Sequence, residues 1–375
     1  MTNQYFATVA RGLEALAAAE LNKLGASAVS PGFCGVAFTG DLELLYRVNL
    51  WARLPFRILL KLAEFPCEDR DDLYNGIQGL NWQGYLTPAQ TLAVTATGKS
   101  DRLNHTHFTA LQVKNAIVDQ QCQQFKARSP VDPQRPDVLV NVHIHRDRCV
   151  VSLDSSASSL HRRGYRPAVG LAPLKESLAA ALVEISGWQP DSALFDPLCG
   201  SGTLPLEGCL NALNMAPGLF RDTFGFETWP NFDRPLWEQL RQEAYAVEKD
   251  SLGAFIGGCD RSANVINQAR SNAQACGVDR FVTFSQTELA EVEAPADSGV
   301  LICNPPYGQR LGRNQDLGEF YKILGDILKQ RFKGWTAFIL SGNKDLAKTI
   351  GLKSSQRLPV YNGSILCQLL KYELY

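Results

Sequence analysis

Residues 194–203 read LFDPLCGSGT, and this stretch decides the fold that we expect for the second half of the chain. Leu194 and Phe195 predict the end of a buried strand. Asp196 follows, and glycines at 200 and 202 let the backbone approach a ligand without interference from Cβ atoms. The run TLPLEGCLNAL then predicts a helix. Strand, glycine turn and helix in this order are typical of α/β sheets, which bind ligands at the carboxyl ends of their strands.

The turn differs from both common phosphate-binding motifs. It has no Lys-Ser/Thr pair, and Pro205 stands where the dinucleotide fingerprint has its third glycine. The missing glycine disfavours a nicotinamide-dependent dehydrogenase. Asp196, at the end of its strand, could instead hold the ammonium group of a zwitterionic ligand.

A second acid, Asp260, ends the next predicted strand, FIGGCD. A carboxylate at this place can accept both hydroxyls of a ribose, or it can cap the helix that follows. The two sites are far apart in the sequence because residues 214–250, irregular and rich in aromatic groups, form an apparent insertion after the first helix.

The stretch LICNPPYG (301–308) again runs from an apolar strand into a polar corner. Its two prolines exclude further strand pairing and a helix start at Asn304. The Asn304 side-chain oxygen and the Pro305 carbonyl can both accept hydrogen bonds from an exocyclic amino group, and Tyr307 can stack on a base. With the two acids, this corner favours S-adenosylmethionine facing a planar amino group over a rigid turn without chemistry.

The C-terminal half alternates strands and helices, which predicts a doubly wound, mainly parallel α/β sheet. Asn362-Gly363 between two apolar runs predicts a hairpin, which would form an antiparallel edge. The N-terminal half predicts two α+β units. In the second of these, residues 137–147 alternate apolar and polar side chains, which indicates a strand with one buried face.

The bulk composition indicates a folded protein of two or three domains, with 375 residues of which 45% are hydrophobic. The net charge is −1, yet residues 99–166 carry eleven Lys/Arg against six acids, together with all five histidines. A basic face suits RNA phosphates, although an ordinary solvated surface explains the charge equally well. Within this window, HRRGYR (161–166) suits phosphate and base contact, and a plain linker is the alternative.

Ten cysteines without a CxxC pair argue against a zinc site or a disulfide framework. The two His-x-His pairs have no Cys or carboxylate at a matching spacing, so we expect exposed polar faces and no metal. A reduced cytoplasmic compartment is the simplest location. No apolar run approaches the ~18 residues that span a bilayer, and the start of the chain has no signal-peptide pattern.

DPLCGSGT, CDRS and NPPYG together resemble motifs I, II and IV of amino-directed, S-adenosylmethionine-dependent methyltransferases. LHRRGYR followed by APLKESLAAALVEISGW resembles the segment that joins a THUMP domain to its catalytic domain, and GIQGLNW and FTALQVKNAIVD extend the likeness over nearly the whole chain. The chain is thus similar to the THUMP-containing ribosomal RNA guanine-N2 methyltransferases that act on large-subunit (23S) RNA. The resemblance implies a ferredoxin-like α+β subdomain (1–64), a THUMP RNA-binding domain (65–160), a linker (161–172) and a Rossmann-like methyltransferase domain (173–375).

The resemblance also implies the cofactor, S-adenosylmethionine, the partner, ribosomal RNA, and the residues that contact each. The expected catalytic residues, which hold the guanine, are Asn304, Pro305, Pro306 and Tyr307. The expected cofactor-binding residues are Asp196, Pro197, Cys199, Gly200, Ser201, Gly202, Thr203, Asp260, Thr287 and Asn304. The expected RNA-binding residues are Lys114, His161, Arg162, Arg163, Tyr165 and Arg166.

One stretch departs from the family pattern. Many such enzymes bind the adenine amino group with an Asp near the end of the third strand, where this chain has Gln286-Thr287-Glu288. Thr287, Glu288 or the backbone are the candidates to replace it. The same corner motif serves adenine N6 and protein glutamine N5 methyltransferases, and a noncatalytic RNA-binding protein is the alternative from another class.

Overall fold

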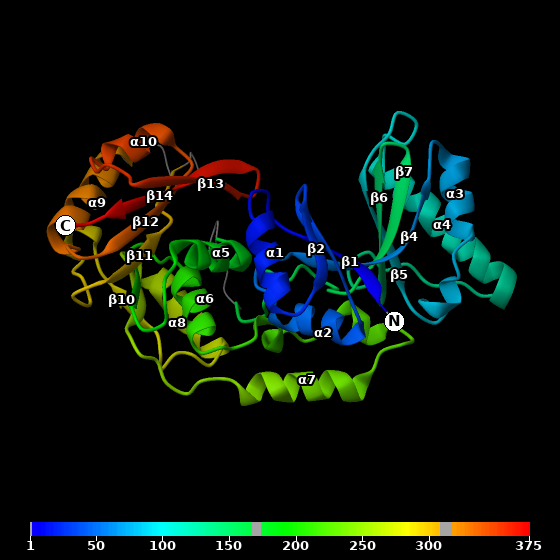
Figure 1. Ribbon diagram of the computed structural model, residues 1–375, viewed down its shortest axis with the longest axis horizontal. Coiled ribbons are helices and arrows are strands. Elements are labelled where there is room, and N and C mark those ends of the chain that lie inside the picture. Colours follow the sequence, from blue (N-terminus) through cyan, green and yellow to red (C-terminus); the bar gives the residue numbers. More distant parts are fainter. Residues whose placement is uncertain (1, 167–173, 308–316) are drawn as a thin grey trace. The chain divides into compact units, whose positions relative to one another are not determined.

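The computed structural model describes residues 2–166, 174–307 and 317–375, which form two compact units (Figure 1). Unit 1 comprises the described residues of Met1–Val9, Ala17–Leu160 and Arg221–Arg241. Unit 2 comprises those of Ala10–Leu16, His161–Phe220 and Gln242–Tyr375. No helix in these described ranges is both long and apolar enough to cross a membrane.

Unit 1 is built on a seven-stranded sheet with the strand order β2-β3-β1-β4-β7-β6-β5. The antiparallel pair β4–β7 joins the strands of the two predicted α+β modules into this one sheet. Its strands are β1 (Asn3–Thr8), β2 (Ser27–Gly32), β3 (Gly35–Gly40), β4 (Arg57–Pro66), β5 (Leu92–Gly98), β6 (Val138–His145) and β7 (Arg148–Asp154). The helices of this part of the chain are α1 (Glu14–Lys23), α2 (Leu42–Trp51), α3 (Arg70–Gln78), η1 (Trp82–Gly84) and α4 (Thr106–Phe125).

The alternation predicted for residues 137–147 is confirmed in β6. Val138, Val140 and Val142 are buried, whereas His143 and His145 are exposed. Sequence patterns missed β2, because its residues, SAVSPG, are mostly small and exposed and show no period-2 alternation of apolar and polar side chains.

Unit 2 contains the second seven-stranded sheet, in the order β10-β9-β8-β11-β12-β14-β13. The first five strands in this order are parallel, and β14 and β13 add an antiparallel edge, as the sequence predicted. Its strands are β8 (Ala193–Asp196), β9 (Ile256–Asp260), β10 (Thr283–Gln286), β11 (Gly299–Cys303), β12 (Thr336–Ser341), β13 (Gln356–Asn362) and β14 (Ile365–Glu373). Its helices are α5 (Glu176–Ser186), α6 (Thr203–Ala212), η2 (Pro217–Phe220), α8 (Ala263–Ala275), η4 (Leu289–Glu291), α9 (Leu317–Arg331) and α10 (Lys344–Thr349).

The predicted insertion, residues 214–250, is divided between the two units. It holds η3 (Gly225–Thr228) and a regular helix, α7 (Arg234–Ala246), that the sequence analysis did not predict. Within unit 1, Phe226 of η3 stacks on Tyr46 with 4.5 Å between ring centroids. The aromatic content of the insertion is therefore used for packing.

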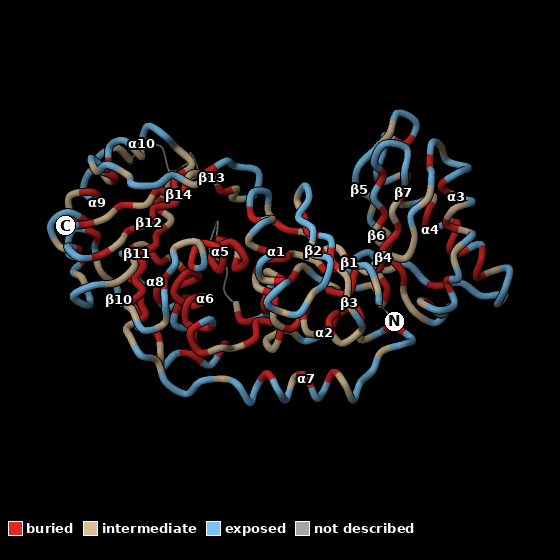
Figure 2. Tube along the Cα trace, viewed as in Figure 1, coloured by how far each residue is buried: buried red, intermediate tan, exposed pale blue. Residues whose placement is uncertain are grey.

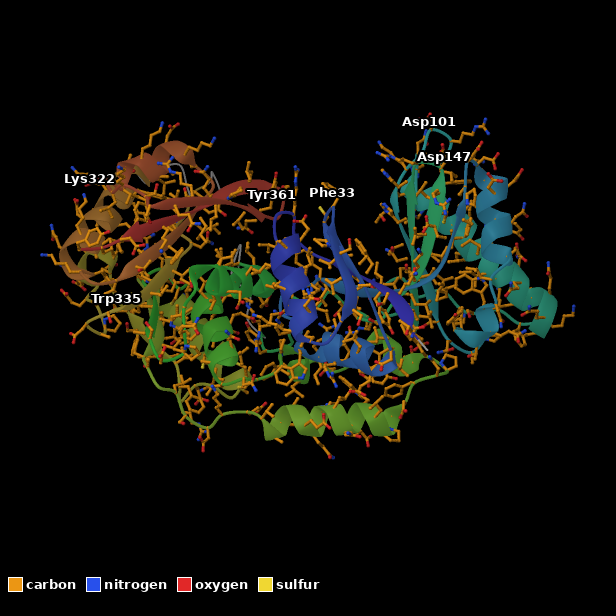
Figure 3. The ribbon with its side chains drawn as sticks, viewed as in Figure 1. Phe33, Asp101, Asp147, Lys322, Trp335 and Tyr361 are labelled. Carbon is orange, nitrogen blue, oxygen red and sulfur yellow. The ribbon has the colours of Figure 1, made fainter. Side chains whose placement is uncertain are left out.

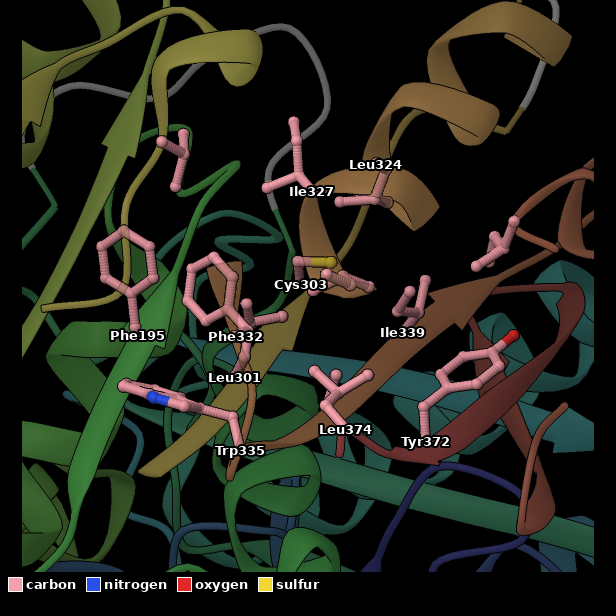
Figure 4. Packing of buried hydrophobic residues seen from close by; sticks show 14 of the residues in the cluster. Phe195, Leu301, Cys303, Leu324, Ile327, Phe332, Trp335, Ile339, Tyr372 and Leu374 are labelled. Atoms are coloured by element: carbon pink, nitrogen blue, oxygen red, sulfur yellow. The ribbon is translucent and has the colours of Figure 1, made fainter. Parts of the chain in front are cut away.

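Helices cover both faces of the sheet in unit 2. Leu194 faces α6, because a Cβ placed on Gly208 of that helix would lie 2.3 Å from the Leu194 Cδ2 atom. The next residue, Phe195, points to the opposite face, as successive strand residues do. There it stacks on Phe332 in the cluster drawn in Figure 4, which also includes Leu324 of α9. Figure 2 shows buried residues along much of β12, α5 and α6, and all four residues of β8 are buried. The strand ends therefore rest on a closely packed core.

Candidate active site

Parallel pairing brings the three predicted site segments to one edge of the sheet. β8 lies between β9 and β11, and Asp196, Asp260 and Asn304 stand at the carboxyl ends of these three neighbouring strands. Chain order reverses at β8, so this edge is the topological switch point at which open α/β sheets bind ligands.

The glycine turn takes a backbone shape that other residues rarely adopt. Gly200 has φ +55° and Gly202 has φ +83°. A Cβ on Gly202 would lie 2.7 Å from the Phe284 ring, whereas one on Gly200 would meet nothing within 4 Å. Gly202 therefore allows close packing below the turn, and Gly200 leaves open space for a ligand.

Asp260 connects two loops at the site. Its Oδ2 atom accepts the Gly200 N–H at 3.3 Å, and its Oδ1 atom accepts the Ser262 N–H at 2.9 Å. The N-cap of α8 is Ser262, so the alternative in which Asp260 itself caps that helix is wrong. Asp260 is half-buried, which leaves its carboxylate partly accessible to a ribose.

Asp196 is a buried carboxyl group with 3% of its surface exposed. Its Oδ1 atom accepts the Leu198 N–H at 3.0 Å. Burial, together with the charge of Asp260, raises the pKa of Asp196 to about 8. A carboxyl group in this environment is stabilised as the anion by a nearby cation, so it fits the ammonium of S-adenosylmethionine.

Asn304 carries a buried side-chain oxygen that accepts no hydrogen bond from the described part of the protein. An unsatisfied buried acceptor costs roughly 1–3 kcal/mol. Such a cost is relieved when a donor arrives, so the Oδ1 atom suits an amino group that enters the corner.

Three groups that the sequence analysis did not connect with the site contact Tyr307. Asn362 Nδ2 donates to the Tyr307 hydroxyl at 2.7 Å, and the Cys367 thiol donates to it at 3.6 Å. Gly342 lies against the ring, where a Cβ would be 2.6 Å from Tyr307 Cδ2. The predicted Asn362-Gly363 hairpin was the only signal, and it did not indicate this partner.

Thr287, predicted to take the place of an adenine-binding acid, lies just after β10. Its N–H donates to the Asp260 carbonyl at 3.1 Å, and its hydroxyl lies 3.1 Å from that of Ser285. Thr287 is therefore adjacent to the ribose-binding candidate, and its contact with adenine stays a prediction. The remaining predicted residues of the turn, Pro197, Cys199, Ser201 and Thr203, are all buried beside it.

Arg163 and Tyr165 lie in the interior of unit 2, which contradicts the prediction that they contact RNA. Arg163 is 1% exposed, and its Nη2 atom lies 3.4 Å from Glu207 Oε2 on α6. The Tyr165 hydroxyl donates to Glu207 Oε1 at 2.8 Å. The physical reason is the buried Glu207 carboxylate, which needs a cation and hydrogen-bond donors inside the fold.

Arg166 is also engaged within unit 2. Its guanidinium pairs with Glu176 at 3.1 Å and donates to the Ser201 hydroxyl of the glycine turn at 2.9 Å. It therefore supports the glycine turn, and the structure does not support the predicted RNA contact.

The other three predicted RNA-binding residues are more accessible. Arg162 is exposed, and His161 and Lys114 are half-buried. Burial and neighbouring cations lower the pKa of His161 to about 4, so this side chain is neutral at pH 7. Their contact with RNA stays a prediction.

Unit 1 contains a basic cavity of about 330 Å³. The Arg70 guanidinium lies over the Phe108 ring, 4.3 Å from its centroid. In the described part of the chain none of the lining residues is acidic; they are Arg70, Arg102, Leu103, Asn104, His105, His107, Phe108, Thr109 and Leu111. In the described ranges no group of three or more His, Cys, Asp or Glu side chains could hold a metal ion.

Three family models match the chain. Residues 163–371 match the RMKL-like methyltransferase domain, residues 67–154 the THUMP domain, and residues 4–59 the RlmL ferredoxin-like domain.

Curated relatives and solved structures match over the whole chain. A candidate RNA methyltransferase of Synechocystis sp. is 56% identical, over 100% of this chain and 97% of its own length. The ribosomal RNA large subunit methyltransferase K/L of Syntrophotalea carbinolica is 42% identical, over 99% of this chain and 53% of its own length. The chain thus spans about half the length of its K/L relatives.

Two solved structures share the complete fold. A candidate methyltransferase complexed with SAH, SMU.472, has a TM-score of 0.90 at 31% identity and covers 100% of this chain and 98% of its own. A protein of Listeria monocytogenes, named as a predicted N6-adenine-specific DNA methylase, has a TM-score of 0.89 at 30% identity and covers 100% and 97%.

Proposed function

The chain belongs to the THUMP-containing, S-adenosylmethionine-dependent RNA methyltransferases, and from this premise we propose that it methylates the exocyclic N2 amino group of a guanosine in large-subunit (23S) ribosomal RNA. The observation that carries the proposal is the buried Asn304 Oδ1 atom at the switch point of the sheet, which has no hydrogen-bond partner among residues 2–166, 174–307 and 317–375. The names of the K/L relatives support the choice of large-subunit RNA.

The residues at the sheet edge fit the cofactor, which supplies an electrophilic methyl group on a sulfonium when bound. Asp196 would hold its ammonium, Asp260 its ribose hydroxyls, and the open space at Gly200 would admit it close to the backbone. Burial of Asp196 and the free space at Gly200 support the first and third assignments, and the position of Asp260 at the end of β9 supports the second.

The Asn-Pro-Pro-Tyr segment then orients the base for methyl transfer. The Asn304 oxygen and the Pro305 carbonyl accept hydrogen bonds from the amino group, which localises the nitrogen lone pair towards the methyl group. The Tyr307 ring, held by Asn362, stacks on the base. Positioning and fixed dipoles thus perform most of the catalysis, and the displaced amine proton leaves to solvent.

Unit 1 offers a separate contact for RNA. The cavity lined by Arg70, Arg102, His105 and His107 has Phe108 in its wall. Guanidinium groups suit phosphates and an aromatic ring suits a base, the combination that single-stranded RNA sites use. This cavity supports RNA as the substrate over a protein glutamine.

The test uses purified protein, labelled S-adenosylmethionine and large-subunit RNA from cells that lack this enzyme, followed by digestion to nucleosides. We expect labelled N2-methylguanosine. Asn304→Ala should lower kcat about 10²–10³-fold, as loss of a charge-stabilising group does, while binding of S-adenosylhomocysteine persists. Asn211→Ala, an exposed asparagine on α6, serves as the matched control.

The same experiment separates the alternatives. Labelled N6-methyladenosine would overturn the choice of base and favour the activity in the name of the Listeria protein. No label in RNA or ribosomal particles would overturn the proposed substrate and redirect the search to protein glutamine or a noncatalytic role. Full activity of Asn304→Ala would contradict the positioning mechanism.

A further inference from the structure

The tip of the β13–β14 hairpin exposes two large apolar side chains. Ile365 is 45% exposed and Leu366 is 53% exposed. Single exposed apolar residues are common on protein surfaces, so the place of these two decides whether they matter. Both lie directly after the tight turn in which Asn362 pairs with Ile365.

One face of this hairpin forms the wall behind Tyr307. Asn362 and Cys367 both donate to the Tyr307 hydroxyl. Ile365 shares this face, because it is two residues from Cys367 and opposite Asn362. A Cβ on Gly342 would lie 2.6 Å from the Tyr307 ring and 3.3 Å from Ile365 Cγ2. Ile365 therefore extends the wall of Tyr307 outward into solvent.

The opposite face of the tip combines an apolar surface with a cation. Leu366 pairs with Tyr361, the β13 residue labelled in Figure 3. The Arg11 guanidinium lies over the Tyr361 ring, 5.0 Å from its centroid. Arg11 belongs to unit 2 together with the hairpin. An apolar tip beside a stacked guanidinium has the chemistry that binds unstacked nucleobases and their phosphates.

Asn304 is proposed to bind the amino group of the base and Tyr307 to stack on its ring. Both contacts require the base to leave the RNA stack. Extrusion from a helix costs a few kcal/mol, and proteins that unstack bases insert apolar side chains into the gap. We propose that Ile365 and Leu366 form a wedge that enters the RNA stack beside the target nucleotide, while Tyr361 and Arg11 contact the flanking nucleotide. This inference rests on the proposed function and adds a substrate-opening element to it.

The test compares the double variant Ile365→Ser/Leu366→Ser with wild type on two RNA hairpins. Both carry the 23S segment around the guanosine labelled in the experiment above, with that guanosine either paired or opposite an abasic site. We expect kcat/KM of the double variant to fall about tenfold or more on the paired RNA and to stay within about twofold on the abasic one, where extrusion costs least. Val247→Ser is the control, since Val247 is 49% exposed in the same unit.

Two readouts separate a wedge from a general structural effect. The affinity for S-adenosylhomocysteine and the melting temperature should not change. With 2-aminopurine next to the target, wild type should raise its fluorescence and the double variant should not.

Equal losses of kcat/KM on both hairpins, or no loss on either, would overturn the wedge. The proposed function fails at an earlier step, when wild type yields no labelled guanosine in large-subunit RNA, so the two failures are distinguishable.

Discussion

The raised pKa of Asp196 makes cofactor binding depend on pH in a way that can be calculated. The carboxyl is 3% exposed, and burial raises its pKa to about 8. At pH 7 about nine-tenths of the cofactor-free molecules therefore carry a protonated Asp196. The ammonium of the cofactor favours the carboxylate, so each binding event at pH 7 should release about 0.9 proton.

The affinity for S-adenosylhomocysteine, which carries the same ammonium, should thus increase about ninefold from pH 6 to 7, about fivefold from pH 7 to 8, and only about twofold more above pH 8. Isothermal titration calorimetry at pH 7 in two buffers of different ionisation enthalpy measures the released proton directly. A Kd that is equal at pH 6 and pH 8, with no proton released, would refute the reasoning, because Asp196 would then be ionised before the cofactor arrives.

The same pKa shift affects stability with a defined sign. Asp196 binds its proton more tightly in the folded state than in the unfolded state, where its pKa is about 3.8. Its contribution to the free energy of unfolding of the cofactor-free protein therefore falls as pH rises from about 4 to about 8, by roughly 1.4 kcal/mol per pH unit.

Asp196→Asn keeps an acceptor for the Leu198 N–H but has no charge. At pH 8 this variant should be more stable than cofactor-free wild type in urea denaturation, and it should bind S-adenosylhomocysteine at least 100-fold more weakly, which corresponds to about 2.8 kcal/mol. Asp191→Asn, at an exposed site, should change neither quantity. A destabilised Asp196→Asn that retains binding would contradict the assignment.

Two further substitutions test the support of the site. Glu207→Ala removes the carboxylate that pairs with the buried Arg163 and should lower the free energy of unfolding by about 3–5 kcal/mol. Glu184→Ala, on the exposed side of α5, is the control. A decrease below about 1 kcal/mol for Glu207→Ala would argue against a buried ion pair. Gly202→Ala places a Cβ 2.7 Å from the Phe284 ring at φ +83° and should cost about 1–3 kcal/mol, seen as a lower melting temperature and weaker S-adenosylhomocysteine binding. An alanine variant with wild-type melting and binding would show that the turn tolerates the side chain.

Much of unit 2 could be predicted because its signals are local. An apolar strand followed by Asp196 and a glycine turn, or by Asn304 and two prolines, identifies strand ends from adjacent residues. Alternation of strands and helices then favours a parallel sheet, and in such a sheet the carboxyl ends of neighbouring strands meet. The sheet edge that holds the candidate site and the hairpin at Asn362-Gly363 therefore followed from the sequence by itself.

Other features depended on contacts between residues far apart in the chain, which no local pattern reports. HRRGYR has the composition of an RNA-binding segment, yet Arg163 and Tyr165 are buried because both bind the buried carboxylate of Glu207. Glu207 lies 44 residues from Arg163 and 42 residues from Tyr165 in the sequence. The hydrogen bond from Asn362 to Tyr307 joins residues that are 55 positions apart in the sequence. Sequence determined which groups stand at the strand ends, because neighbouring residues decide where a strand stops. Only the tertiary structure decided which charges are buried and which side chains support the corner, because burial and pairing are properties of the packed chain.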